Sequence, residues 1–331
     1  MQIQAPSTSY QITDVYTHSQ PSIDELVAIW VLVQFGWANY DVKIHFGPVS
    51  TFKTKAVEMK LLKQGKIYLG IGGGMFDEHP TCYRKRVKGE CAATLLGQFM
   101  GIRENPSLSQ IFQLALNDDL GIGPEDRAGK VLAKFSLPAY IKMMYRNEVW
   151  DFEQIKEFAF QMLNEHYECQ ELFWGSKGEC ELGESFDLRF RGKPYSLLKI
   201  KSENPKAAEY AIAKLHYSLV LQIRNSGNWQ IFSSKYSDLK TLVPYIAARL
   251  KQREACLCGI KYDPTNLMEE GSLPGLDSIY FFKAGGMIFN GSLTHQAKPS
   301  RLDPHKIPYL IEELLHKMAT LQPQKRSSQT A

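Results

Sequence analysis

The sequence predicts an α/β fold, in which a parallel-sheet domain with a helical cover is followed by a smaller α+β domain. Three observations lead to this prediction. Apolar strand-like segments alternate with helical segments early in the chain, which is typical of a parallel sheet. Later segments pair around short glycine-containing turns, as hairpin strands do. The length of 331 residues also favours two domains over one.

The first domain is expected to contain three strands, at residues 10–16, 42–46 and 66–71. Its helices are expected at residues 23–35, 52–62, 90–100, 108–119, 128–135, 138–146 and 152–172. Asp24 and Glu25 fall in the first turn of the first helix, where acidic side chains suit the helix dipole. The later helices are expected to form a helical subdomain that covers the sheet.

A shift in composition predicts the domain boundary. Residues 175–185 are rich in Gly, Ser and Glu, so the first domain is assigned to residues 1–180 and the second to residues 181–322. The polar residues 323–331 are expected to be a disordered tail. The second domain is expected to pair strands around turns at residues 191–194, 225–228 and 284–285, with helices at residues 205–215, 239–254 and 304–318.

Composition bounds the class of protein. The chain is 44% apolar and 22% charged, which is ordinary for a globular protein, and its formal charge of +4 permits an anionic substrate without indicating a protein that coats nucleic acid. The six cysteines contain no C-x-x-C pair, so they are interpreted as reduced thiols of a cytoplasmic protein. The most apolar segment, residues 26–35, is too short to span a bilayer, and no membrane association is expected.

The most informative stretch is residues 70–80, where a predicted strand ends in glycines and is followed by Asp77, Glu78 and His79. The carboxyl edge of an open α/β sheet is where ligands bind. Carboxylates and imidazole without thiolate suit Mg²⁺, Mn²⁺ or Fe²⁺ rather than a structural zinc. The alternative is an exposed polar turn, but three consecutive glycines favour close approach of the backbone to a ligand.

Two other places in the first domain offer candidate metal ligands. His18 and Asp24 lie across a predicted strand-to-helix turn, and the alternative is a surface histidine with an ordinary carboxylate early in the helix. Asp118 and Asp119 end a predicted helix, where carboxylates oppose the helix dipole and a cation would compensate. The alternative there is a solvated helix end.

Two segments are candidates for substrate binding. Arg84, Lys85 and Arg86 follow the glycine stretch closely and are suited to a phosphate chain. A turn in the second domain offers backbone donors, hydroxyls and an imidazole for an anion or a sugar, from Asn290, Gly291, Ser292 and His295. The alternative for the first segment is a series of solvent-exposed charged side chains, and for the second it is a hairpin turn with ordinary polar side chains.

The order of these motifs resembles that of the DHH phosphoesterase superfamily, and most closely its melanocyte-proliferating-gene branch of DHH-like exonucleases. The resemblance covers roughly the first 125 residues and is carried by four motifs: Thr17-His18 through Asp24-Glu25, Leu69 through Gly73, Phe76-Asp77-Glu78-His79, and Asp118-Asp119-Leu120-Gly121-Ile122. The chain departs from the family pattern at Ser22, Gly70 and Glu78, so the metal site is divergent. At Gly70 the family commonly carries an aspartate that bridges two metals.

The resemblance implies a catalytic domain followed by a substrate-binding domain, with divalent Mn²⁺ or Mg²⁺ between them. The positions that match metal ligands are His18, Asp24, Asp77, His79 and Asp119, and those that match catalytic positions are His79, Asp77 and His18. The family site holds two metals, so three alternatives follow from Gly70: Asp77, Glu78 or Asp118 replaces the bridging carboxylate, one metal suffices, or catalysis is lost.

Two functional hypotheses follow from the sequence. The first is a metal-dependent phosphoesterase, a nuclease-type hydrolase that cleaves short oligonucleotides or nucleotides. The alternative is a catalytically degenerate DHH-like module that binds a nucleotide or a protein partner without hydrolysis. The expected partner is a nucleotide or a short single-stranded nucleic acid, and the sequence is compatible with a homodimer.

Overall fold

The computed structural model describes residues 10–47, 55–79, 87–124, 126–291, 297 and 299–320. The chain divides into two compact units, Met1–Glu171 and Leu172–Ala331. The division falls inside one long helix, α7 (Phe152–Glu181). The tail expected at residues 323–331 lies outside the described residues.

The stretch expected to link the domains is helical for most of its length. Although Gly175 and Gly178 are poor helix formers, α7 continues through both and ends at Glu181. Phe173, Trp174 and Cys180 pack into an apolar cluster of the second unit. Because these side chains are held by packing, tertiary contacts outweigh the low helix propensity of the glycines.

The first unit is built on a small parallel sheet. Its three strands, in the order β2-β1-β3, are β1 (Ile12–Thr17), β2 (Ala38–Phe46) and β3 (Lys66–Tyr68). Both pairings with β1 are parallel, and the register places Tyr16 opposite His45 on one side and Tyr68 on the other. The three strands therefore end at one edge, as the alternation of strands and helices predicts.

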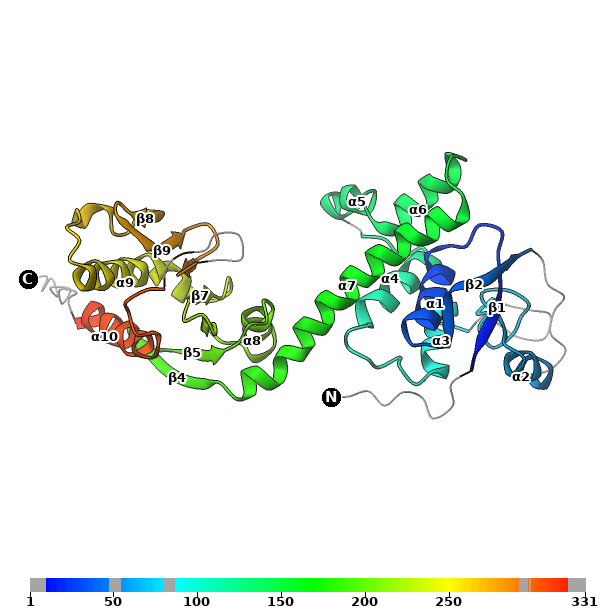
Figure 1. Cartoon of the computed structure of the whole chain (residues 1–331), viewed down its shortest axis with the longest axis horizontal. Helices are drawn as coiled ribbons and strands as arrows, with labels where there is room; N and C mark the ends of the chain where they lie inside the picture. Colours follow the sequence, from blue (N-terminus) through cyan, green and yellow to red (C-terminus); the bar gives the residue numbers. More distant parts are fainter. Residues whose placement is uncertain are drawn as a thin grey trace, which may run out of the picture. The chain divides into compact units, whose positions relative to one another are not determined.

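Helix α1 (Ile23–Gln34) is the centre of this unit. Residues 23–32 are all buried, so the helix has no solvent face. It packs against α3 and α4 (Figure 1), and the indole nitrogen of Trp30 donates to Asn164 Oδ1 on α7 at 2.7 Å. The other helices of the unit are α2 (Lys55–Lys63), α3 (Ala92–Phe99), α4 (Ser109–Asp119), α5 (Arg127–Ala133) and α6 (Leu137–Arg146).

The second unit contains the larger sheet. Its seven strands lie in the order β4-β5-β6-β7-β10-β9-β8, with β5 and β6 parallel and every other neighbouring pair antiparallel. The strands are β4 (Glu184–Phe190), β5 (Lys193–Lys201), β6 (Leu219–Ile223), β7 (Trp229–Ser233), β8 (Gly271–Leu273), β9 (Leu276–Phe282) and β10 (Met287–Phe289).

Helices cover both faces of this sheet. Successive side chains of a strand point to opposite faces, so they pack against different helices. Leu197 and Leu219 face the cluster formed with α9 (Val243–Cys258) and α10 (Ile307–Thr320). Leu198 and Val220 face α8 (Ala207–Leu215) and the end of α7. Short 3₁₀ turns are η1 (Asp238–Leu242), η2 (Pro264–Asn266) and η3 (Pro304–Lys306).

The observed architecture confirms a mixed α/β protein with a parallel sheet in its first part. Within the described residues, no helix has both the length and the apolar composition that crossing a membrane requires. The 30-residue helix α7 is long enough but too polar.

Gly65 provides a test of this packing, because its carbonyl accepts from Thr13 and Asp14 at the start of β1. Its φ is +80°, and a Cβ there would lie 2.8 Å from the carbonyl oxygen of Gln11. Gly36 has a similar φ of +72° with open space around it. We expect Gly36→Ala to lower the free energy of unfolding by about 1–2 kcal/mol because of its left-handed backbone. Gly65→Ala should lower it by about 1–3 kcal/mol more because of the clash.

Urea unfolding of the full-length variants, followed by tryptophan fluorescence, measures the difference. Equal decreases in the free energy of unfolding for the two substitutions would contradict the close approach of Gly65 to β1.

Candidate metal centre and active site

A cavity of about 530 Å³ lies at the carboxyl edge of the parallel sheet. Each strand contributes the residues that follow it: His18 and Ser19 after β1, Gly47 after β2, and Gly70, Ile71 and Gly72 after β3. Asp77 and His79 complete the lining. This is the edge at which α/β sheets bind ligands, so the predicted strand ends do meet at a hollow.

The glycine loop after β3 returns the chain to the strand end. Gly70, Gly72 and Gly73 have φ of +68°, +82° and +68°, a region that other residues rarely adopt. The amide of Gly70 donates to the carbonyl of Phe76 at 2.8 Å, which closes the loop. The buried ring of Phe76 anchors it in the core. Asp77 therefore begins a short segment fixed beside the strands.

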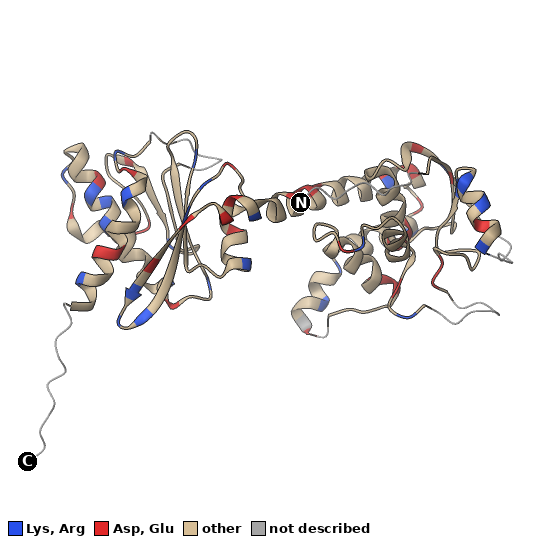
Figure 2. Ribbon diagram, turned by 90° about the horizontal axis from the view of Figure 1, so that it is seen from below, with Lys and Arg blue, Asp and Glu red and all other residues tan. Residues whose placement is uncertain are grey.

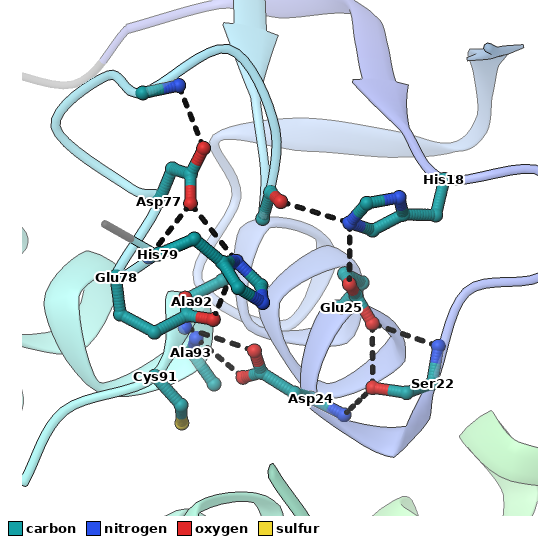
Figure 3. A network of polar contacts seen from close by, with 12 residues as sticks. His18, Ser22, Asp24, Glu25, Asp77, Glu78, His79, Cys91, Ala92 and Ala93 are labelled. Atoms are coloured by element: carbon teal, nitrogen blue, oxygen red, sulfur yellow. Dashed lines mark hydrogen bonds and ion pairs between the residues drawn. The ribbon is translucent and has the colours of Figure 1, made fainter. Parts of the chain in front are cut away.

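Asp77, Glu78 and His79 form a compact group of potential metal ligands, which we call the acidic-histidine cluster. One ligand atom from each residue lies within 4.8 Å of the others. The Nδ1 atom of His79 lies 3.1 Å from Asp77 Oδ1 and 3.0 Å from Glu78 Oε1 (Figure 3). The amide of Gly73 donates to Asp77 Oδ2 at 2.6 Å and that of His79 to Oδ1 at 2.9 Å, so the Asp77 carboxylate is held rigidly.

Glu78 is the most deeply buried residue of this cluster. It is 1% exposed, and its Oε2 atom is buried with no hydrogen-bond partner among the described residues. Burial raises the pKa of Glu78, and the nearby charges of Asp119 and Asp77 also raise it, while His79 lowers it. A buried carboxylate oxygen without a partner is costly, and a bound cation removes that cost. The donor set of two carboxylates and one imidazole fits a divalent ion such as Mn²⁺ or Mg²⁺.

Asp24, one of the predicted metal positions, is held by backbone amides. Its carboxylate accepts from the amides of Ala92 and Ala93 at 2.9 and 2.8 Å, at the start of α3. Burial, followed by the charge of Glu25, raises the pKa of Asp24 to about 7. The structure therefore places Asp24 at the N-terminus of a helix, beside the acidic-histidine cluster and outside it.

Glu25 is a site residue that the sequence analysis did not single out. Its Oε2 atom accepts from the amide and the hydroxyl of Ser22 at 2.7 and 2.6 Å, and its Oε1 atom lies 3.8 Å from His18 Nε2. A Cβ on Gly70 would lie 2.7 Å from this Oε1 atom. Gly70 thus leaves room for the Glu25 carboxylate. The capping-box spacing of Ser22 and Glu25 was the available signal.

His18 is positioned by the same strand ends. Its Nε2 atom lies 2.9 Å from the carbonyl oxygen of Gly70, so in the neutral ring Nε2 carries the proton and donates it. The rings of His18 and His79 face one another across the cavity with centroids 6.3 Å apart. His18 therefore lines the cavity but does not join the acidic-histidine cluster.

Glu58 on α2 anchors the glycine loop from the other side. It is 4% exposed, and both of its carboxylate oxygens lie 2.7 Å from the amide nitrogen of Met75. A Cβ on Gly74 would collide with this carboxylate. The sequence carried no signal for this contact, because a helical glutamate and a loop amide 17 residues apart have no fixed relation.

The two aspartates at the end of α4 lie in different environments. Asp118 pairs with Lys142 Nζ at 2.6 Å, so a lysine compensates its charge. Asp119 lies near enough to Glu78 to raise its pKa, although Asp119 is not part of the acidic-histidine cluster. Of the five predicted metal positions, the structure brings Asp77 and His79 together and leaves His18, Asp24 and Asp119 around them.

The predicted substrate-binding residues are either outside the described residues or in the second unit. Arg84, Lys85, Arg86, Ser292 and His295 are outside the described residues. In the second unit, the side-chain Nδ2 atom of Asn290 donates to the carbonyl of Ser278 at 2.6 Å, and the carbonyl of Gly291 accepts from the side chain of Gln230 at 3.0 Å. Asn290 is fully buried, so its side chain acts within the fold of that unit.

Comparison with known proteins adds little to these observations. No family model matches the chain, and no curated protein matches it. Among solved structures, the chain is similar to an uncharacterized protein from Helicobacter pylori G27 at 11% identity, over 92% of this chain and 99% of that one. The TM-score of 0.22 is too low to show a shared fold. The resemblance to the DHH superfamily therefore rests on the sequence motifs alone.

The raised pKa of Asp24 gives a pH dependence that can be measured. Because the carboxyl binds its proton more tightly in the folded state than in the unfolded state, the stability that Asp24 contributes is fully present below its ordinary pKa of 3.8 and is lost as the pH rises toward about 7. The loss is at most about 1.4 kcal/mol per pH unit. We expect Asp24→Asn to flatten this slope in urea titrations with EDTA present.

Asp126→Asn is the matched control, because Asp126 caps α5 with an exposed side chain. The control should keep the wild-type slope between pH 4 and 7. An unchanged slope in Asp24→Asn would contradict a protonated, buried Asp24.

Proposed function

We propose that this chain is a metal-dependent phosphoesterase that hydrolyses phosphodiester bonds in short oligonucleotides or nucleotides. The observation that carries the proposal is the acidic-histidine cluster, whose Asp77 and His79 line the cavity and whose buried Glu78 Oε2 atom has no hydrogen-bond partner among the described residues. The sequence motifs that resemble those of DHH phosphoesterases support the same assignment. Asp77, Glu78 and His79 would hold a divalent Mn²⁺ or Mg²⁺ ion.

The residues around the cavity have distinct roles in this proposal. A bound divalent cation supplies a water of lowered pKa and neutralises charge on the phosphoryl oxygens. The His79 nitrogen that now donates to the two carboxylates is the one that would ligate, with the ion replacing its proton. His18 would use its free Nδ1 atom to accept or deliver a proton, since Nε2 is bound to Gly70.

The size and charge of the first unit favour a short substrate. The cavity of about 530 Å³ is within the range of small-molecule sites. Lys and Arg positions are interspersed with Asp and Glu positions in the described parts of both units (Figure 2). Proteins that bind long nucleic acids gather basic residues into a patch or stripe. A nucleotide or short single strand therefore fits better than a long duplex.

A second candidate function is binding without hydrolysis. Gly70 provides no carboxylate at the strand end, and the Asp24 carboxylate is engaged by the amides of α3. Only one compact group of ligands remains among the described residues. These observations favour a degenerate module that retains a nucleotide or a protein partner.

We infer a cytoplasmic location from the thiols. All five described cysteines are free, which supports a reducing compartment.

The test compares hydrolysis of a labelled dinucleotide and of short single strands with Mn²⁺, Mg²⁺ or EDTA. We expect turnover that depends on Mn²⁺ or Mg²⁺, and a loss of more than about 100-fold in Asp77→Asn and in Glu78→Gln. That loss exceeds what residues supporting a metal ligand usually cause. Asp118→Asn is the matched control, because its carboxylate pairs with Lys142 outside the cluster.

Two outcomes would contradict the hydrolase. Full activity in Glu78→Gln would show that the site is placed wrongly. No turnover by wild-type protein that has bound the metal would support the binding module in its place.

A further inference from the structure

The second unit contains a separate cavity of about 260 Å³. It lies where η1 and the start of α9 meet the turn between β9 and β10. Its lining includes Lys240 and Thr241 from η1, Val243 and Pro244 from α9, and Phe281, Lys283 and Gly286 from the β9–β10 hairpin. None of these residues belongs to the site of the first unit, so the cavity requires its own explanation.

Two lysines from distant parts of the chain border this small space. Lys240 is half-buried and Lys283 is exposed, and the described residues give neither an ion-pair partner. The acid nearest to Lys240 in sequence, Asp238, is engaged by Lys193 at 2.7 Å. Two ammonium groups at one cavity repel each other, and an anion bound between them would remove that repulsion.

The hairpin turn is fixed in a way that keeps Lys283 at the cavity. The Ser233 hydroxyl donates to the carbonyl of Gly286 at 2.8 Å, which ties the turn to the end of β7. A Cβ on Gly286 would lie 2.5 Å from that hydroxyl oxygen and 3.6 Å from Lys240 Cγ. The stem of Lys240 therefore lies across Gly286, and the turn and η1 are held against each other.

The floor of the cavity is apolar. Phe281 is 1% exposed and Val243 is buried, so the two lysines share the cavity lining with a surface of low polarity. An ion pair beside such a surface is stronger than the same pair in water. Phosphate carries more charge than a carboxylate and can accept from both ammonium groups at once.

We propose that this cavity binds a phosphate group carried by a small molecule, with Lys240 and Lys283 as its cationic ligands. The volume of about 260 Å³ suits inorganic phosphate, pyrophosphate or a small phosphate ester. The site does not depend on the metal-dependent activity proposed for the first unit, because no residue is shared between them.

Calorimetric titration of the full chain with inorganic phosphate and with pyrophosphate tests the proposal. EDTA is kept in the buffer, so that a metal at the acidic-histidine cluster cannot contribute phosphate binding. We expect saturable binding at one site that weakens as salt is raised. Lys240→Ala with Lys283→Ala should weaken it at least about tenfold, since hydrogen bonds to charged groups are the strong ones.

The matched control is Lys235→Ala with Lys261→Ala, which removes the same charge from exposed positions of the same unit outside the cavity. It should bind within about twofold of wild type, and Lys240→Arg with Lys283→Arg should retain binding. Thermal unfolding of each variant shows that the second unit remains folded. Absence of saturable binding in wild type, or an equal loss in the two alanine pairs, would overturn the proposal.

Discussion

The burial of Glu78 is the constraint on which the first unit's site depends. This carboxylate is 1% exposed, and one of its oxygens has no hydrogen-bond partner in the part of the chain that the structure describes. Such a group destabilises the fold, and here it lies next to a second buried carboxylate and an imidazole. Selection for stability alone would favour an apolar side chain in this place. The arrangement is understandable if the three residues together hold a cation, because the ion then provides the missing partner.

Glycines make this arrangement possible by leaving space for other acids. Gly70 leaves room for Glu25, whose carboxylate closes the capping box of α1 and faces His18. Gly74 leaves room for Glu58, which holds the amide of Met75 and so fixes the loop that carries Asp77. A glutamate from α1 thus occupies the space beside Gly70 after β3, and a glutamate from α2 holds the loop that follows.

Local sequence signals predicted the parts of this site that depend on local structure. The three strands and helix α1 follow from alternation, apolar content and the acidic first turn of the helix, and the strand ends do meet at a cavity. The rest depends on contacts between residues far apart in sequence. The Asp24 carboxylate is drawn to the amides of α3, 68 and 69 residues away. The glycines of α7 are helical because neighbouring side chains pack into the second unit.

Locating a bound metal ion would test directly whether the acidic-histidine cluster is a metal centre. Crystals of the full chain soaked in Mn²⁺ would be examined by anomalous scattering at the manganese edge. We expect a peak bounded by Asp77, Glu78 and His79, within ligand distance of Glu78 Oε2, and its loss in Glu78→Gln. A peak elsewhere, or none at saturating Mn²⁺, would contradict a metal centre at this cluster.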